Sequence, residues 1–340
     1  MRNFTINSKL LINRSGGFGD NLLWSATLPF LFKKYKSISL DLCTHGYQLF
    51  WNDPRFEYIH YFEPRTIPIE ERNQKLTEHR ESLSSLYPDH DILDFHYSIE
   101  GHCITYDVAE DAELSQEERA AKYSKNFYDA QFEFAKVAMP EGWRHRNTIF
   151  FSREETDAVE RWRNRAGDYF VLILVLGGSS IQKVFPTWMK GFCRRLIREL
   201  PKLKIYLMGD NQCRGEGWEC ERTINLIEKV GFKQSLHMTK YADYVLGSET
   251  GLLIGAGMFG TPKTALCTIS AVDQCFNYHE NDFSLQSKSK CSPCHMLAYS
   301  GRLCPKEPVY NNFPICTHEW DRDEIFSLIA AQYRKWRGTV

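Results

Sequence analysis

Three glycines and an aspartate follow the first apolar run of the chain. The segment 13–29 reads NRSGGFGDNLLWSATLP, and its turn holds Gly16, Gly17, Gly19 and Asp20. Glycine permits positive φ and lets a ligand approach the backbone. A glycine-rich turn between a strand and a helix is a usual place to hold a phosphate or to bring a catalytic side chain close to a substrate. Asp20 is therefore either a helix N-terminal cap or such a catalytic side chain. The loop lacks both the G-x-G-x-x-G dinucleotide fingerprint and the Lys-Ser/Thr of a P-loop.

A second candidate anion site lies at LGGSSIQKVFPTW, residues 176–188. A long apolar run leads into small residues, among them Ser179 and Ser180, whose backbone amides can bind an anion. Lys183 can reach a phosphate bound at this turn, and Pro186 suits the first turn of a helix. The alternative is an ordinary solvated lysine, which is the usual place for this residue type.

A third candidate is GSETGLLIGAGMFGTP, residues 247–262. Glu249, Thr250 and Gly251 precede a glycine-rich helix whose first amides would point at a second anion. The small residues along this helix also suit plain packing of a helix against a sheet, so both interpretations stay open.

Four cysteines near the C-terminus have the spacing C-x2-C-x9-C-x11-C: Cys291, Cys294, Cys304 and Cys316. This is the ligand set of a tetrathiolate site, for which zinc is the default and iron fits equally. Four thiolates leave no open position for a substrate, so the metal would be structural. His295 or His318 could replace one cysteine, and free thiols are the alternative.

Apolar and helical patterns alternate along the whole chain. This alternation is typical of mostly parallel sheets flanked by helices. Expected strands are 9–13, 38–43, 55–62, 90–97, 169–180, 204–210, 244–247 and 264–268. Expected helices are 20–35, 66–87, a pair within 110–138, and then 153–167, 186–200, 219–230 and 248–259. These patterns predict two doubly wound domains with a boundary near 147–153: residues 1–150, residues 151–320 with the four-cysteine finger at 291–316, and a C-terminal helix at 321–340.

The composition is that of a soluble globular protein: 43% hydrophobic, 25% charged, with a net charge of −1. A nucleic-acid partner normally shows as a basic excess, which is absent. The N-terminal residues are polar, and the apolar runs are too short to span a bilayer. We therefore expect a cytoplasmic protein with no secretory signal, and thiols rather than a disulfide framework.

The motifs, in this order, resemble glycosyltransferase family 9, the bacterial ADP-heptose heptosyltransferases. Residues 13–29 look like the strand, glycine loop and G-D signature of that family. SSIQKVFPTW resembles its K-x-W-P turn, with Phe185 in place of Trp. GSETGLLIGAGMFGTP resembles its D-T-G-x-x-H-x-x-A-x-x-G-T-P block, with Glu249 in place of Asp and Ile254 in place of His. The four cysteines are similar to the metal finger of the autotransporter protein heptosyltransferases.

The resemblance implies a GT-B fold, in which two Rossmann-like domains face each other across a cleft, and an inverting transfer of a sugar to a hydroxyl. The N-terminal domain would bind the acceptor and the C-terminal domain the nucleotide-sugar. Asp20 would be the general base. Lys183 and the amides at Thr250 and Gly251 would stabilise the departing diphosphate. Asp210 would help to hold the ribose or base, and no catalytic divalent metal would be required.

ADP-heptose is the donor that the resemblance implies, and the acceptor would be a hydroxyl on a saccharide or a protein. The departures at Glu249 and Ile254 leave a UDP- or GDP-hexose donor open. A sugar-nucleotide-binding protein without activity is a further alternative. A homo-oligomer and a peripheral contact with a membrane stay open as well.

Overall fold

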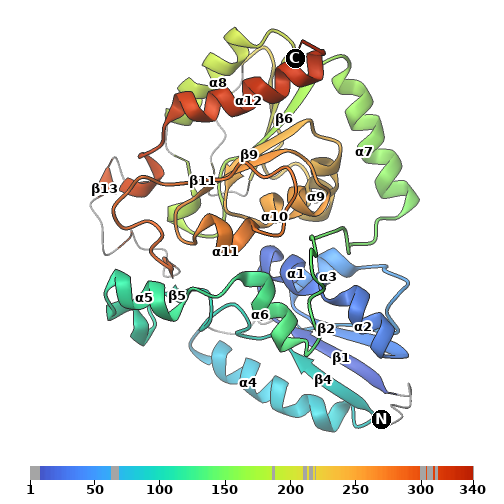
Figure 1. Ribbon diagram of the computed structural model, residues 1–340. Helices are drawn as coiled ribbons and strands as arrows, with labels where there is room; N and C mark the ends of the chain where they lie inside the picture. The colour runs from blue at the N-terminus through green and yellow to red at the C-terminus, as the bar shows by residue number, and fades with distance from the viewer. Residues whose placement is uncertain are drawn as a thin grey trace. The chain divides into compact units, whose positions relative to one another are not determined.

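A computed structural model describes the residues 8–62, 69–185, 188–209, 213, 217–218, 220–298, 304, 309–310 and 313–339. The chain forms two compact units (Figure 1). Unit 1 comprises Met1–Ile99, Tyr128–Gly142 and Thr148–Phe151, and unit 2 comprises Glu100–Phe127, Trp143–Asn147 and Ser152–Val340. No helix in the described part of the chain has the length and apolar character that a bilayer span requires.

Unit 1 contains a parallel sheet with the strand order β3-β2-β1-β4. Its strands are β1 (Lys9–Arg14), β2 (Ser37–Leu42), β3 (Ile59–Tyr61) and β4 (His90–Asp94). Its helices are α1 (Phe18–Ser25), α2 (Leu28–Lys34), α3 (Thr44–Phe50), α4 (Ile69–Leu86) and α6 (Phe127–Phe134). The core centres on Trp24, whose ring lies 5.1 Å from Phe50 and 5.6 Å from Phe95. The order places the chain reversal between β1 and β4, where ligands bind in open α/β sheets.

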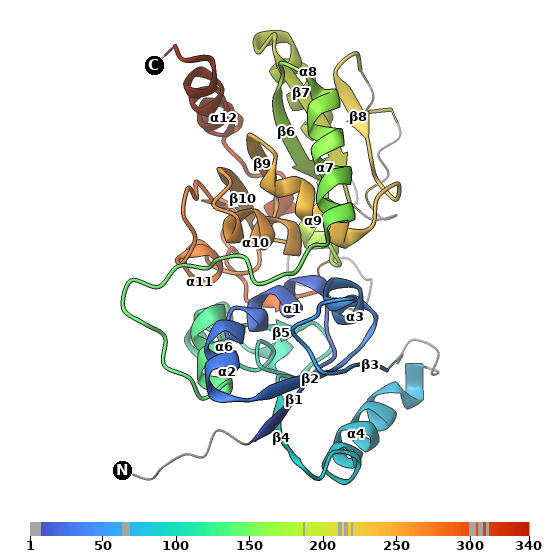
Figure 2. The same ribbon diagram turned by 90° about the vertical axis from the view of Figure 1, so that its right-hand side faces the viewer.

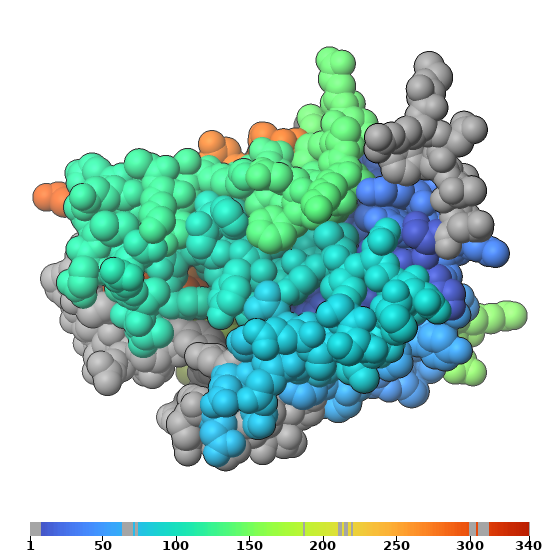
Figure 3. Space-filling view, turned by 90° about the horizontal axis from the view of Figure 1, so that it is seen from below, coloured from blue at the N-terminus to red at the C-terminus, as the bar shows by residue number. Residues whose placement is uncertain are grey.

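The structure differs from the expected helix at 20–35 and adds detail to the helix expected at 66–87. The single helix expected at 20–35 is wrong, because α1 and α2 are separate helices. Pro29 lies in the first turn of α2, and a proline inside a continuous helix would clash with the preceding turn. Helix α4 is surface-exposed in Figure 3, where it runs in blue to cyan, and Leu83 is the one buried side chain among those described in it.

Unit 2 contains a six-stranded sheet with the order β11-β10-β9-β6-β7-β8, all of whose pairs are parallel. The strands are β6 (Phe170–Val175), β7 (Leu203–Met208), β8 (Thr223–Asn225), β9 (Tyr244–Ser248), β10 (Lys263–Cys267) and β11 (Leu285–Gln286). Read from the other edge, this is the doubly wound order 3-2-1-4-5-6 of dinucleotide-binding folds. The chain reversal lies between β6 and β9.

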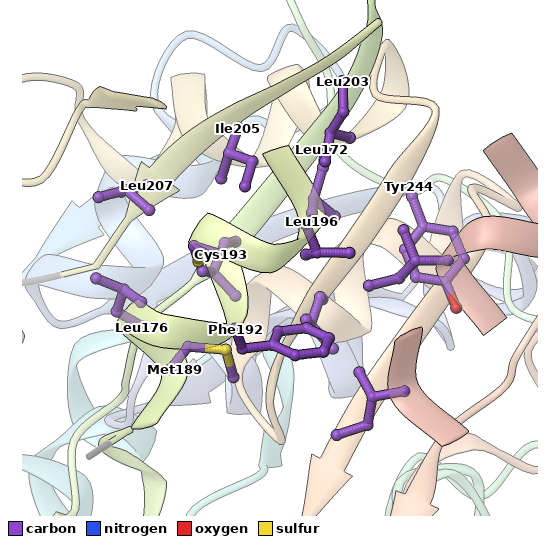
Figure 4. Close-up of a cluster of buried hydrophobic side chains, with 14 of the residues drawn as sticks. Leu172, Leu176, Met189, Phe192, Cys193, Leu196, Leu203, Ile205, Leu207 and Tyr244 are labelled. Carbon is purple, nitrogen blue, oxygen red and sulfur yellow. The ribbon is translucent and has the colours of Figure 1, made fainter. Parts of the chain in front are cut away.

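Helices cover both faces of this sheet. They are α7 (Arg153–Ala166), α8 (Trp188–Glu199), α9 (Phe232–Lys240), α10 (Gly251–Met258), α11 (Val272–Phe276) and α12 (Arg322–Arg337). Figure 2 shows α7 in front of β6 and β7, with α12 to the left of these strands. Figure 4 shows the core on the face that α8 covers, where Met189, Phe192 and Leu196 of α8 pack against Leu172 and Ile205.

The helix expected at 219–230 is wrong. Its first residue lies outside the described residues, and the segment forms the edge strand β8 followed by turns. Thr223 and Ile224 are β-branched and pair with β7 opposite Ile205 and Tyr206. The helix of this region, α9, begins later, at Phe232.

The segment 100–127 belongs to unit 2, although residues of unit 1 separate it in sequence from the rest of that unit. The region 110–138, where a helix pair was expected, contains three elements. A 3-10 turn (Glu110–Glu113) and α5 (Gln116–Lys122) lie in unit 2, and α6 follows in unit 1. Strand β5 (Thr105–Tyr106) pairs in parallel with β12 (Met296–Leu297). The Gln274 side chain donates to the carbonyls of Cys103, Tyr123 and Lys125 at 2.6–3.0 Å.

Gly257 in α10 should not tolerate a side chain. A Cβ at this position would lie 2.5 Å from Cγ of His279, whose ring packs against the helix. We expect Gly257→Ala to lower the free energy of unfolding by about 1–3 kcal/mol, because the added methyl overpacks a filled site. Urea denaturation measures the change through the midpoint at constant m-value.

Gly191 in α8 is the matched control. A Cβ there has no neighbour within 4 Å, so Gly191→Ala should raise the free energy of unfolding by about 0.5–1 kcal/mol. Equal effects of the two substitutions would contradict the packing of His279 against α10.

Candidate functional site

The glycine turn of unit 1 encloses an ion pair. Oδ2 of Asp20 accepts the Gly17 N–H at 2.7 Å and lies 3.3 Å from Nη2 of Arg14. The Arg14 side chain is buried, and its Nη1 donates to the Phe95 carbonyl at 2.6 Å. A Cβ on Gly16 would lie 2.8 Å from Oδ2 of Asp20 and 2.9 Å from Nε of Arg14. Glycine is therefore needed at position 16 because the ion pair occupies the space of a side chain.

Glycine permits positive φ, but none of these three glycines adopts it. Gly17 has φ −69°, and neither Gly16 nor Gly19 adopts a positive φ. Gly19 lies inside α1 rather than in the turn. The turn needs glycine at position 16 because the Asp20 carboxylate and the Arg14 side chain lie against its backbone. It does not need glycine for a left-handed backbone conformation.

Asp20 does cap α1. It is the third residue of the helix, and its carboxylate accepts the N–H of the N-cap residue Gly17, which is one half of a capping box. The Asp20 side chain is also 27% exposed. An unprotonated carboxylate at such a position can accept a proton from a hydroxyl. The capping contact and a role in proton transfer are therefore chemically compatible.

Three further groups lie where β1, β2 and β4 end, and sequence reasoning missed them. Ser15 Oγ and His96 Nδ1 share a hydrogen bond of 2.7 Å across the chain reversal of unit 1. The Gly16 N–H donates to Sγ of Cys43 at 3.3 Å, and the His96 N–H donates to Oδ1 of Asp94 at 2.9 Å. Ser15, Cys43 and His96 could have been found in the sequence by one common feature, since each lies just after an apolar strand pattern.

The turns after β6 and β9 meet at the chain reversal of unit 2. A Cβ on Gly178 would lie 2.8 Å from Cγ2 of Thr250 and 3.5 Å from Cδ of Lys183. Lys183 ends a 3-10 turn at Ile181–Lys183, and Thr250 is the N-cap residue of α10. The structure thus brings together residues from two separate sequence motifs, beside the first turn of a helix.

Two buried hydroxyls lie at the end of β9 and the start of α10. Oγ of Ser248 and Oγ1 of Thr250 find no hydrogen-bond partner among the described residues. Buried polar groups are normally satisfied, so two unpaired hydroxyls at this turn make it a candidate for ligand binding. The hydroxyl of Ser180 differs, because it donates to Oε1 of Gln182 at 2.9 Å and caps the 3-10 turn. Ser179 is exposed.

Glu249 is buried and faces the protein interior. Its carboxylate accepts the backbone N–H groups of Ile269 at 2.6 Å, Ser270 at 3.1 Å and Thr268 at 3.2 Å. The Thr268 hydroxyl adds a contact at 3.3 Å. These bonds use the carboxylate to join the turn after β9 to the loop after β10. Ile254 is buried in α10, and Asp210 and Pro186 lie outside the described residues.

The four cysteines lie close enough to interact electrostatically. Burial raises the pKa of the Cys294 thiol to about 12. Burial also raises the pKa of Cys316, with smaller contributions from Cys294, Cys291 and Cys304. Within the described part of the chain, however, no three Cys, His, Asp or Glu side chains are arranged to hold a metal ion. The donor chemistry suits zinc or iron, so binding would require the thiols to move together.

Replacing Glu249 by glutamine should destabilise unit 2. The amide retains one acceptor oxygen but turns an NH2 group toward backbone N–H donors, which leaves buried donors unpaired. We expect the free energy of unfolding to fall by about 1–3 kcal/mol, measured by urea denaturation. Glu141→Gln, at an exposed position, is the control and should change it by less than about 0.5 kcal/mol. A Glu249→Gln protein as stable as this control would show that the carboxylate is not needed there.

Sequence comparison identifies no relatives. No protein-family model matches the chain, and no curated protein matches it significantly.

Comparison of structures gives matches along almost the full chain. A family 9 glycosyl transferase from Veillonella parvula matches with a TM-score of 0.66 and 11% identity, over 98% of this chain and 99% of its own. The ADP-heptose lipopolysaccharide heptosyltransferase II of E. coli matches with 0.60 and 11%, over 97% and 99%. The dodecameric iron-containing heptosyltransferase TibC, solved with ADP-D-β-D-heptose, matches with 0.59 and 12%, over 98% and 77%. The TM-scores show a shared fold, and identities of 11–12% show no more than the fold. The expected α/β fold of the GT-B glycosyltransferases is therefore confirmed.

Proposed function

We propose that the protein is an inverting glycosyltransferase of family 9 that transfers a sugar from a nucleoside diphosphate sugar to a hydroxyl. The observation that carries this proposal is the meeting of Lys183, Gly178 and Thr250 at the chain reversal of unit 2, in a fold shared with heptosyltransferases. ADP-heptose is the favoured donor because the TibC structure holds ADP-D-β-D-heptose. The acceptor would be a hydroxyl of a saccharide or a protein.

In the proposed reaction, the Asp20 carboxylate takes the proton of the acceptor hydroxyl. The acceptor oxygen bonds to the anomeric carbon while the bond from that carbon to the phosphate oxygen breaks, so the nucleoside diphosphate leaves with the electron pair. Arg14 holds Asp20 in place through the buried ion pair. A positioned base contributes about 10²–10⁴-fold in rate.

The departing diphosphate gains negative charge, and unit 2 supplies positive partners for it. Lys183 provides a cation, and the amides at Thr250 and Gly251 start α10, whose N-terminus favours an anion. The unpartnered hydroxyls of Ser248 and Thr250 are further donors. Asp210 is proposed for the ribose or base. The scheme requires no catalytic divalent metal.

The base assignment predicts a specific loss in Asp20→Asn. Asparagine keeps an oxygen that can accept the Gly17 N–H but cannot take a proton from an alcohol. We expect kcat to fall about 10²–10⁴-fold with nucleotide affinity unchanged. The assay is transfer of labelled sugar to saccharide and serine-peptide acceptors. Asp89→Asn, at an exposed position, is the control and should keep full activity.

A donor panel separates the proposal from its alternatives. Ligands that bind the native state raise the melting temperature by mass action. ADP-heptose and ADP should raise it more than UDP or GDP sugars do. A shift with UDP alone would reject heptose as the sugar. Binding without transfer by the unmodified protein, with every donor and acceptor, would favour a sugar-nucleotide-binding protein without activity.

We propose in addition that the four cysteines bind zinc or iron. A tetrathiolate metal would hold an irregular segment together, and TibC is an iron-containing protein. Elemental analysis of the purified protein should find about one metal ion per chain, and the double variant Cys291→Ser, Cys294→Ser should lose it. Cys220→Ser is the control, since Cys220 bonds with Thr223 in another part of unit 2. Metal-free protein as purified, with no uptake on reconstitution, would contradict the proposal.

A further inference from the structure

Gln182, the residue before Lys183, links the turn after β6 to the cysteine segment, defined here as residues 291–298. The Gln182 side chain is buried. Its Oε1 accepts the Ala298 N–H at 2.7 Å, and its Nε2 donates to the Met296 carbonyl at 2.9 Å and lies 3.7 Å from Sγ of Cys294. One amide group therefore holds three residues of a segment more than a hundred positions away.

The backbone of the same residue extends the network. The Gln182 carbonyl accepts the Thr268 hydroxyl at 3.0 Å. Thr268 in turn binds the Glu249 carboxylate through its N–H, and its own carbonyl accepts the Ser292 hydroxyl at 2.9 Å. The turn after β6, the turn after β9 and the cysteine segment thus share one buried hydrogen-bond network.

This network restricts the position of Lys183. Both atoms of the Gln182 amide are bonded, and a shift of the 3-10 turn would leave them unpaired in the interior, which costs free energy for each lost bond. Lys183 is the next residue in that turn. Its side chain lies beside Gly178, whose Cβ position is also close to Thr250.

We propose that Gln182 is a positioning residue through which the cysteine segment sets the geometry of the phosphate-binding turn, and so the affinity for the donor nucleotide. The segment would then act as a support for the nucleotide site as well as a candidate metal site. This inference rests on the proposed function, because it takes the turn after β6 to bind the diphosphate.

The test compares two buried glutamines of unit 2. Gln182→Met keeps the length of the side chain and removes its hydrogen bonds. Gln274→Met is the matched control, since Gln274 also donates to buried carbonyls but contacts neither the turn after β6 nor the cysteine segment in any bond described here. Isothermal titration with ADP, UDP and GDP measures affinity, and urea denaturation measures stability.

We expect both variants to be less stable, and only Gln182→Met to bind the nucleotide about five- to tenfold more weakly. In transfer assays the change should fall on the KM for the donor more than on kcat, as expected for a group that does not touch the reacting atoms. Equal nucleotide affinity in Gln182→Met and the unmodified protein would overturn the inference and leave the proposed function intact. No binding of any of the three nucleotides by the unmodified protein would overturn both.

A milder pair keeps the test usable if Gln182→Met fails to fold. Thr268→Val removes the hydroxyl that bonds the Gln182 carbonyl, and Thr268→Ser retains it. Weaker nucleotide binding in the valine variant with recovery in the serine variant would support the network. Affinities unchanged in both would contradict it.

Discussion

A buried carboxylate must be fully hydrogen-bonded, and Glu249 meets this requirement with three consecutive backbone amides. The contact fixes the loop after β10 against the turn after β9. Because Thr268 belongs to that loop and bonds Gln182, the turn after β6 is fixed by the same group. The candidate nucleotide site therefore depends on a carboxyl group whose hydrogen bonds are made inside the protein and not to a ligand.

Unit 1 uses the same kind of solution. The Arg14 guanidinium is buried, and the pair with Asp20 fills the space beside Gly16. In each unit a glycine in the turn after a central strand is required because a neighbouring side chain occupies the Cβ position: Asp20 and Arg14 at Gly16 after β1, and Thr250 at Gly178 after β6. These glycines give close approach to the backbone, and the groups that crowd them are the ones we assign to chemistry.

The cysteine segment is hydrogen-bonded to two other parts of unit 2, the turn after β6 and the segment 100–127. Gln182 bonds it from the turn after β6, and Nε of Arg119 donates to the Cys294 carbonyl at 2.9 Å. Gln116 donates to the Pro293 carbonyl at 3.2 Å. The segment 100–127 therefore contacts the cysteine segment as well, and these two hydrogen bonds fix residues that lie outside the short strand β12.

The sequence by itself determined the alternation of strands and helices, since continuous apolar runs such as 169–180 mark buried parallel strands whatever surrounds them. It also placed Asp20, Lys183 and Thr250 in segments that follow strands, because such positions are set by local patterns. It did not reveal β8, whose three residues form a strand only because β7 offers a partner. The roles of Arg14, His96 and Gln182 could not be predicted either, since their hydrogen bonds to Phe95, Ser15 and Met296 join residues 81, 81 and 114 positions apart. Only the tertiary structure decided which polar groups are used up inside the protein and which remain for a ligand, because a hydrogen bond between distant segments exists only after both sheets have formed.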